Sequence, residues 1–255
     1  MKYWKEHFST GYRDAHGQLD VSASQSSEIV SILSAGTFFG ALFSAPVADK
    51  LGRRLGMIFN SLVFTFGVIL QTASTHIPMF VAGRFFAGLG VGLLSATVPL
   101  YQSETAPKWI RGTVVGAYQL AITIGLLIAA IVLNGTKNRD DSGSYRIPVA
   151  VQFALALVLI TGMIFLPETP RYLIRKGKPE QAAVSLSRLR RLGIDHPALV
   201  QELAEIQANH DYEMALGNAS YLDVIKPPLR KRLLTGMGVQ SLQQLTGKCQ
   251  PSICR

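Results

Sequence analysis

The sequence predicts an all-α integral membrane protein, and two observations carry that prediction. The apolar residues are gathered in runs of about twenty, the length at which a helix crosses the hydrocarbon core of a bilayer. Only 16% of the 255 residues are charged, against about a quarter in an ordinary soluble domain, and the mean hydropathy is +0.26. We therefore expect most of the chain to lie in a membrane.

Five apolar runs are long enough to cross the bilayer. Their predicted bounds are 28–48, 55–73, 79–100, 113–133 and 147–166, so that residues 28–167 form a transmembrane bundle. A sixth apolar stretch begins near Leu233 and becomes polar after Gly247, which makes it too short to span by itself.

The basic residues predict how these spans are oriented. Loops 49–54, 104–112 and 168–232 are rich in Lys and Arg and lie on one side if the spans alternate, whereas loop 74–78 has neither. Such loops are typically cytoplasmic, so we expect residues 1–27 to be extracellular. The formal charge of +9 then suits anionic lipid headgroups rather than nucleic acid, which needs basic residues on an exposed face.

Residues 168–230 predict a soluble helical domain on the cytoplasmic side. Pro179 stands at the first position of a helix whose leucines recur at helical spacing, and Gly193 is expected to end it. A second helix is expected to begin at Pro197. A pair of amphipathic helices covering the membrane face is the favoured interpretation, and a dedicated partner site is the alternative.

Charged residues recur at the predicted membrane boundary. The run from Asp49 to Arg54 joins the first two spans, and its glycine permits a tight turn. Arg84 lies inside the third span, where an ionised side chain needs a counter-charge or the bundle interior. Glu104 and Arg111 flank the next basic loop. A simple cluster that fixes orientation is the alternative interpretation of the first run.

Three further motifs complete an ordered set. Residues 167–171 read Pro-Glu-Thr-Pro-Arg after the fifth span, Gln119 lies in the fourth span, and Gln243 and Gln244 lie in the last apolar stretch. In this order and spacing the motifs resemble the sugar porter family of the major facilitator superfamily, and most of all its fungal monosaccharide transporters. The resemblance covers nearly the whole chain to Gly247.

The resemblance implies a fold of twelve helices in two halves, with the substrate between them at the membrane midplane. The five spans would be helices two to six, residues 168–230 the cytoplasmic domain between the halves, and residues 231–255 the start of the second half. No segment matches the first helix of the family with its Gly-Tyr-Asp motif, and Cys249 stands where the family has an asparagine. We therefore expect a chain truncated at both ends, which by itself does not transport.

The resemblance also implies roles for named residues. Glutamines that match Gln119, Gln243 and Gln244 bind sugar hydroxyls, which suits amides because they both donate and accept hydrogen bonds. A hydrogen bond between helices is the alternative role for Gln119. The other matches form a cytoplasmic set of salt bridges that holds the outward-facing state. Its members here are Asp49, Arg53, Arg54, Arg84, Glu104, Arg111, Glu168 and Arg171.

The leading hypothesis is therefore transport of a monosaccharide, a hexose such as glucose, across the plasma membrane by alternating access. Proton coupling is expected of the full-length parent, so the expected partners are the sugar, the lipid bilayer and protons, with no nucleic acid. A glucose sensor of the same family and a non-functional fragment are the alternatives. An enzyme is the least expected class, and no cofactor is expected, because no nucleophile–base set, phosphate loop or metal cluster is evident.

Overall fold

The computed structural model describes residues 22–136, 141, 143–215 and 229–247. Over these residues every regular element is an α-helix. The chain forms two compact units, residues 1–206 and 207–255, and each is described by itself. Helix α10 (Leu229–Gly247) belongs to the second unit and, among the described helices, is not one of those apolar enough to span a membrane.

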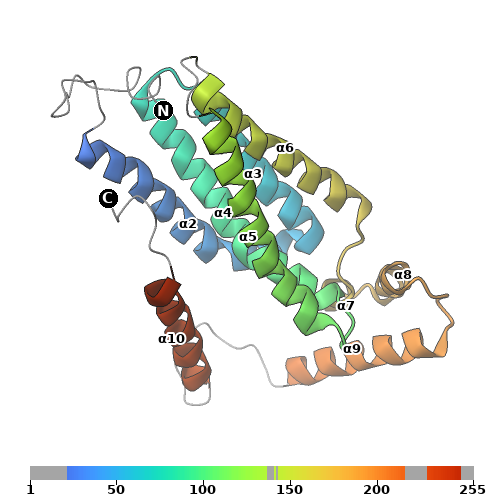
Figure 1. The fold of residues 1–255 in the computed structure, drawn as a ribbon. Helices are drawn as coiled ribbons and strands as arrows, with labels where there is room; N and C mark the ends of the chain where they lie inside the picture. The colour runs from blue at the N-terminus through green and yellow to red at the C-terminus, as the bar shows by residue number, and fades with distance from the viewer. Residues whose placement is uncertain (1–21, 137–140, 142, 216–228, 248–255) are drawn as a thin grey trace. The chain divides into compact units, whose positions relative to one another are not determined.

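Five long helices form the bundle of the first unit (Figure 1). They are α2 (Ala23–Leu51), α3 (Arg53–Ala73), α4 (Ile77–Thr105), α5 (Arg111–Thr136) and α6 (Gly143–Phe165). Each contains a segment long and apolar enough to cross a membrane. The five spans predicted from the sequence lie within these helices to within one residue, so this prediction is confirmed.

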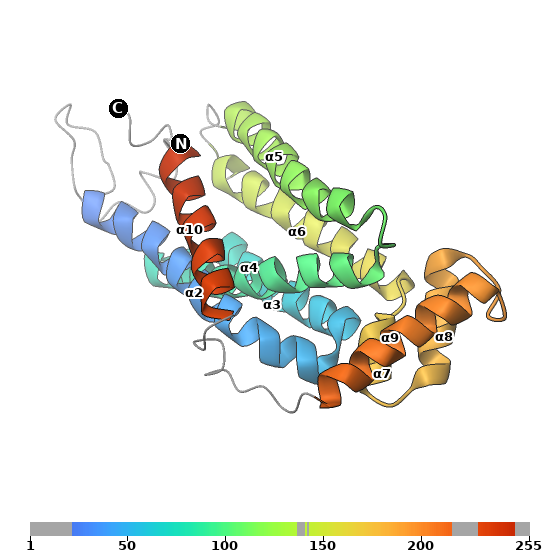
Figure 2. The same cartoon turned by 90° about the horizontal axis from the view of Figure 1, so that it is seen from below.

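Consecutive helices of the bundle run in opposite directions, so the basic loops meet at one end (Figure 1 and Figure 2). At that end Arg53 contacts Glu104 and Glu168, which follow it by 51 and 115 residues. We call it the Arg53 end. At the opposite end, the Ser74 end, the Tyr145 hydroxyl donates to the Ser74 carbonyl at 3.5 Å.

Helix α4 packs closely against both α2 and α3, and small residues make this possible. A methyl group added at Gly92 would lie 2.2 Å from the Thr37 carbonyl oxygen, and one added at Gly40 would lie 2.2 Å from that of Leu89. The backbones of α2 and α4 are therefore in direct contact. Such contact is a common way for membrane helices to associate, because lipid supplies little hydrophobic driving force.

A buried polar group joins the same three helices about two turns from the Arg53 end. The hydroxyl oxygens of Ser44 on α2 and Thr97 on α4 lie 3.3 Å apart, and the Asn60 amide on α3 donates to Thr97 at 3.2 Å. All three side chains are at most 2% exposed. Because a buried polar group costs free energy unless it is hydrogen-bonded, these contacts specify the register of α2, α3 and α4.

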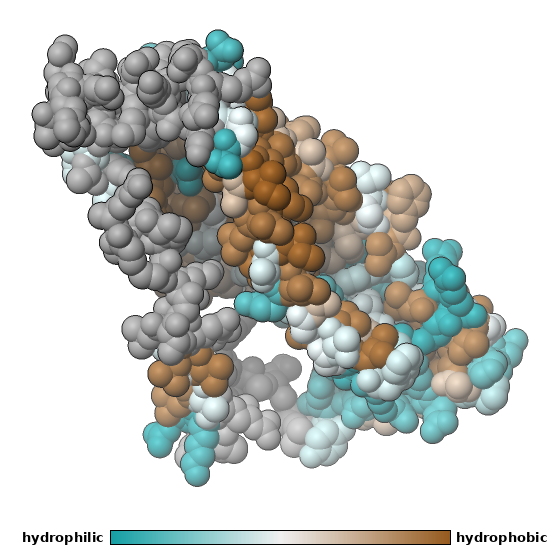
Figure 3. All heavy atoms as spheres, in the orientation of Figure 1, coloured by the Kyte–Doolittle hydropathy of each residue, from teal (hydrophilic) through white to brown (hydrophobic). Residues whose placement is uncertain are grey.

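Helices α5 and α6 present apolar side chains outward. No residue in the most apolar segment of α5 is buried, and Ile131 and Val158 are more than 60% exposed. Figure 3 shows hydrophobic residues gathered over the long helices, with hydrophilic residues around α8 (Pro179–Arg190). Lipid tails or other apolar helices are the surroundings that such a surface suits.

The segment after α6 holds three helices where the sequence predicts two. Helix α7 (Pro170–Arg175) was not predicted, and α8 and α9 (Pro197–Ala215) begin at the expected prolines. Helix α8 ends at Arg190 because Arg191 adopts a left-handed conformation with φ of 54°, so the prediction that Gly193 ends it is wrong. Ala182, Leu186 and Leu199 are at most 1% exposed and form the local core.

The close approach of α2 and α4 gives a stability prediction. Gly92→Ala is expected to destabilise the protein by about 1–3 kcal/mol, because the added methyl must push two backbones apart. Gly116→Ala on α5 is the matched control, since a methyl there meets nothing within 4 Å and alanine has the higher helix propensity. Thermal unfolding of the protein in detergent measures both. Equal melting temperatures for the two variants would contradict the packing described here.

Candidate functional site

The Arg53 end carries a cluster of charged side chains centred on Arg53. Its Nη2 donates to Glu104 Oε1 at 3.1 Å, and both side chains are 8% exposed. Its Nη1 donates to the Ala48 carbonyl at 3.3 Å and lies 3.6 Å from Asp49 Oδ1. A buried charge is tolerated only where it is paired and hydrogen-bonded, so these contacts hold Arg53 between α2 and α4.

Glu168 closes the other side of this cluster. Its Oε1 accepts hydrogen bonds from the backbone N–H groups of Arg53 at 3.0 Å, Arg54 at 3.1 Å and Thr169 at 3.0 Å. The first two belong to the first turn of α3, where N–H groups have no partner within the helix. A carboxylate is also favoured there by the helix dipole. Glu168 thus joins the start of α3 to the segment after α6.

Gly52 makes this approach possible. It has a φ of 91°, which favours glycine, and an added Cβ would lie 2.6 Å from Glu168 Oε2. The expectation that this glycine permits a tight turn is confirmed. The same position also leaves room for the carboxylate, which the sequence analysis did not anticipate.

Arg54 and Asp49 extend the cluster to α6 and α7. The Arg54 side chain donates to the carbonyl oxygens of Met163 at 3.1 Å and Ile164 at 2.6 Å, near the end of α6. Asp49 accepts a hydrogen bond from Arg175 at 2.9 Å. Both side chains of this pair are exposed, and such pairs contribute about 0–1 kcal/mol. Arg175 was missed because α7, which brings it to Asp49, was not predicted.

Two tyrosines were also missed. The Tyr101 hydroxyl on α4 donates to the Pro167 carbonyl at 2.9 Å, and the Tyr172 hydroxyl on α7 donates to the Lys50 carbonyl at 3.1 Å. The Arg53 guanidinium lies 5.4 Å from the centre of the Tyr172 ring, close enough for a cation–π contact. The adjacent Pro167–Arg171 motif was the available signal for Tyr172.

The other predicted members of the set are placed differently. Arg171 is exposed, and no ion pair is seen for it within the described residues. Arg111 begins α5, and its Nε is buried without a hydrogen-bond partner in the part of the chain that the structure describes. Neither contacts Glu104 through an ion pair among the residues described. Their roles in the salt-bridge set stay predictions.

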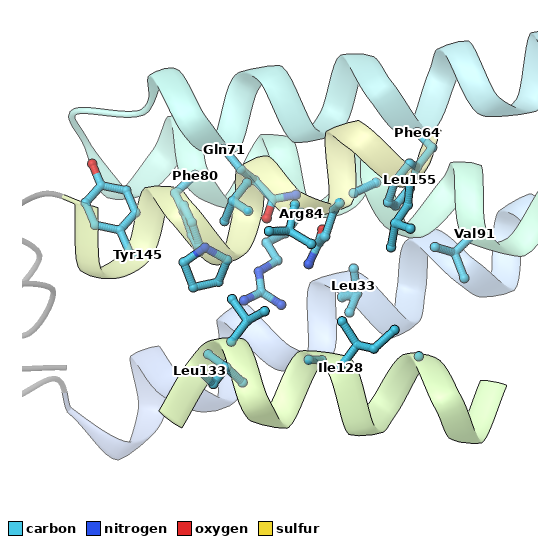
Figure 4. Close-up of a pocket in the computed structure, with 18 residues that line it drawn as sticks. Leu33, Phe64, Gln71, Phe80, Arg84, Val91, Ile128, Leu133, Tyr145 and Leu155 are labelled. Carbon is cyan, nitrogen blue, oxygen red and sulfur yellow. The ribbon is translucent and has the colours of Figure 1, made fainter. Parts of the chain in front are cut away.

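Arg84 lies away from the Arg53 end. It precedes Glu104 by twenty residues on α4, which is about 30 Å along a helix. The prediction requires Arg84 to lie with the salt-bridge set, and the structure places it elsewhere. It lies instead in a cavity of about 580 Å³ lined mainly by apolar residues of α3, α4, α5 and α6 (Figure 4). Its guanidinium stands 5.2 Å from the Phe80 ring, with Gln71 and Gln152 also in the lining.

Of the three predicted sugar contacts, the structure describes the side chain of Gln119. The side chain of Gln119 is exposed on α5 and does not line the cavity around Arg84. Gln243 and Gln244 lie in α10, in the second unit, and their side chains fall outside what the structure describes. Sugar binding by these residues therefore stays a prediction.

Helices α8 and α9 are attached to the bundle by charged and polar contacts. Arg190 forms a two-pronged ion pair with Glu202, at 3.0 Å and 2.7 Å, and also donates to the Thr105 carbonyl at 2.9 Å. Lys108 pairs with Glu205, and the Ser185 hydroxyl donates to the Glu168 carbonyl. The hydrogen bonds from Arg190 hold the pKa of the Glu202 carboxyl below its usual range. Lys108 and Arg111 act in the same direction, and partial burial opposes them.

Comparison with known proteins identifies the family. The family model described as "Sugar (and other) transporter" matches residues 1–250. The chain belongs to this family. It is 63% identical over 247 residues to the major facilitator-type transporter ecdD of Aspergillus rugulosus, covering 97% of this chain and 46% of that protein. It is 55% identical over 249 residues to the probable glucose transporter rco-3 of Neurospora crassa, covering 97% and 42%.

A sensor and a solved structure are also similar. The chain is 44% identical over 232 residues to the high glucose sensor RGT2 of Saccharomyces cerevisiae, covering 89% of this chain and 30% of that protein. The structure of the major facilitator proton:xylose symporter XylE bound to 6-bromo-6-deoxy-D-glucose matches with a TM-score of 0.73 at 24% identity, over 85% of this chain and 49% of that one. The predicted partial major facilitator fold is therefore confirmed. The chain spans between 30% and 46% of the length of these curated relatives.

The contacts of Glu168 give a second prediction. Glu168→Ala is expected to destabilise the protein by about 1–2 kcal/mol, because N–H groups at the start of α3 lose their acceptor. Arg171→Ala, in the same motif but exposed, is the control and should change stability little. Thermal unfolding in detergent measures the loss, and hydrogen exchange at the amides of Arg53 and Arg54 locates it. Equal stability of the two variants would show that Glu168 does not cap α3.

The lowered pKa of Glu202 gives a prediction for pH. Its folded pKa lies below the value of about 4.3 for an unfolded glutamate, so the ion pair adds stability above that value and loses it as pH falls through the folded pKa. The difference in melting temperature between the wild type and Glu202→Gln should be constant from pH 7 to about 5 and shrink below about 4. A difference that grows on acidification would contradict this assignment.

Proposed function

We propose that this chain is the N-terminal part of a membrane carrier for monosaccharides, with a hexose such as glucose as the first substrate to test. The observation that carries the proposal is the match of residues 1–250 to the sugar transporter family. The likeness to the probable glucose transporter of Neurospora crassa supports the choice of sugar. The plasma membrane is the proposed location, because an exchange of sugar with the medium requires it.

In this proposal the Arg53 end faces the cytoplasm, since basic loops are typically cytoplasmic. Arg53, Glu104 and Glu168 tie together the ends of α2, α3, α4 and the segment after α6. Their role is to hold the cytoplasmic side closed while the sugar site faces outward. They separate when the two halves of the carrier rock about the site. A bias of a few kcal/mol is enough to control such an equilibrium.

Gln119 is the proposed sugar contact of this half. Its side chain is exposed on α5, where no described residue occupies its amide, and it is therefore available to donate to and accept from sugar hydroxyls. Gln243 and Gln244 are proposed to contribute from the second half. Proton coupling is part of the proposal for the whole carrier, with no residue of this chain assigned to it.

Sensing of glucose without transport is the second candidate, and the likeness to the high glucose sensor of Saccharomyces cerevisiae favours it. A sensor changes its conformation with glucose but moves little of it. Uptake therefore separates the two functions directly.

The proposal is tested by uptake of labelled glucose in a yeast strain that lacks hexose transport. This chain and the longest protein encoded at its locus are expressed in parallel, and surface protein is measured for each. We expect uptake from the longer form, greater at pH 5 than at pH 7 and reduced by a protonophore. Uptake by neither form, with both at the surface, would overturn the carrier, and a glucose-dependent transcriptional response without uptake would indicate a sensor.

Gln119→Ala in the active form is expected to raise the half-saturating glucose concentration about tenfold, the effect of losing one good hydrogen bond. Gln181→Ala, an exposed glutamine on α8, is the control and should leave it unchanged. The same half-saturating concentration in both variants would remove Gln119 from the sugar site and leave the carrier proposal standing.

A further inference from the structure

Arg190 contacts two elements that are separate in the sequence. From the last turn of α8 it donates two hydrogen bonds to Glu202 on α9 and a third to the carbonyl of Thr105, the last residue of α4. Its side chain is only 13% exposed. A guanidinium suits this position, because its planar array of donors can serve a carboxylate and a carbonyl at once.

The contact with Thr105 matters because Thr105 directly follows Glu104. The last carbonyl groups of a helix have no partner within the helix, and Arg190 supplies one at the end of α4. Glu104 is the preceding residue, and its pair with Arg53 is the buried ion pair of the Arg53 end. The end of α4 therefore carries, on consecutive residues, a contact to α8 and a contact to α3.

The Arg53–Glu104 pair depends on accurate placement. Only one hydrogen bond joins the two side chains, and Glu104 Oε2 and Arg53 Nε are buried without hydrogen-bond partners within the described residues. Hydrogen bonds weaken steeply as distance and angle depart from ideal values. A small shift of the last turn of α4 is thus enough to weaken the pair.

We infer that Arg190 is a positioning residue for the Arg53–Glu104 pair, and that Glu202 holds Arg190 in place for this task. Helix α8 and the start of α9 thereby help to position the charged cluster and do not merely cover it. This inference rests on the proposed role of the cluster as a cytoplasmic gate, but the contact itself exists whether or not the protein carries sugar.

The nearby pair of Lys108 and Glu205 provides a contrast. It joins the loop after α4 to α9, but its side chains are 70% and 42% exposed, and no hydrogen bond from Lys108 to the α4 backbone accompanies it. Exposed ion pairs of this kind contribute little. Its loss should therefore leave the Arg53–Glu104 pair in place, which makes Lys108→Ala the matched control for Arg190→Ala.

The test measures how often the cluster opens. Ala48, whose carbonyl accepts a hydrogen bond from Arg53, is 2% exposed. The full chain in membranes, with Cys249→Ser and Cys254→Ser, carries Ala48→Cys as a reporter, and its alkylation by N-ethylmaleimide is timed. Ala87→Cys, at a site 3% exposed where α4 meets the Gly67 backbone of α3, reports global unfolding in a second series.

We expect Arg190→Ala and Glu202→Gln to speed alkylation at position 48 by about fivefold or more, equivalent to about 1 kcal/mol, with little change at position 87. Lys108→Ala should change neither. Arg190→Lys should behave like Arg190→Ala, because an ammonium keeps the charge but cannot reproduce the three directed bonds. Hydrogen exchange at the amides of Arg53 and Arg54, which needs no introduced cysteine, should rise in the same variants.

Unchanged alkylation at position 48 in Arg190→Ala would overturn the inference. So would an equal rise at positions 48 and 87, since that is global destabilisation, and so would a normal rate in Arg190→Lys, since charge alone would then suffice. The assay needs no sugar. Faster alkylation at position 48 would leave the inference standing even if the longest protein encoded at the locus takes up no sugar, a result that removes the carrier proposal alone. Uptake by that longer protein with unchanged alkylation at position 48 would do the opposite.

Discussion

The carboxylate of Glu168 at the start of α3 is the contact on which the Arg53 end of the bundle depends. It accepts backbone hydrogen bonds from Arg53 and Arg54 across 115 and 114 residues of sequence. It fixes the start of α3, and with it the position from which the Arg53 side chain reaches Glu104 on α4. The opening of α7 is fixed at the same time, because Glu168 also accepts from the N–H of Thr169. One side chain thus helps to place three helices, α3, α4 and α7.

The packing of α2, α3 and α4 imposes a second constraint, which explains why the helix ends lie so close together at the Arg53 end. Glycines bring the α2 and α4 backbones into contact, and the Ser44, Thr97 and Asn60 group fixes the register of all three helices. This close packing lets the charged residues at the helix ends meet at hydrogen-bonding distance. Helices α5 and α6 lack such contacts over much of their length, and their apolar side chains remain exposed.

The sequence predicted the long helices well and the contacts between charged residues less well, for a physical reason. Length and apolar character decide whether a membrane helix exists, and both are local properties that can be read from five runs of residues. Contacts depend on which ends meet. The pattern indicated that Arg53, Glu104 and Glu168 share one end, which the structure shows, but it also assigned Arg84 there, about 30 Å along the same helix. Arg175 and Arg190 could not be assigned, because their partners are distant in sequence or on another helix and are reached only through the packing of α7 and α8.

Several buried polar atoms of the charged cluster lack a hydrogen bond among the described residues. Arg53 Nε, Glu104 Oε2 and Arg111 Nε are buried without hydrogen-bond partners within the described part of the chain, and the same holds for atoms elsewhere, such as Asn60 Oδ1 and Arg84 Nε. A fully satisfied buried network would lock its elements together, whereas each unmade hydrogen bond raises the free energy of the closed arrangement. The Arg53–Glu104 pair is therefore held by fewer directed bonds than its buried polar atoms could make. A pair held by one hydrogen bond is sensitive to small displacements, so a contact such as that of Arg190 with the end of α4 has more effect on it than the strength of that contact alone implies.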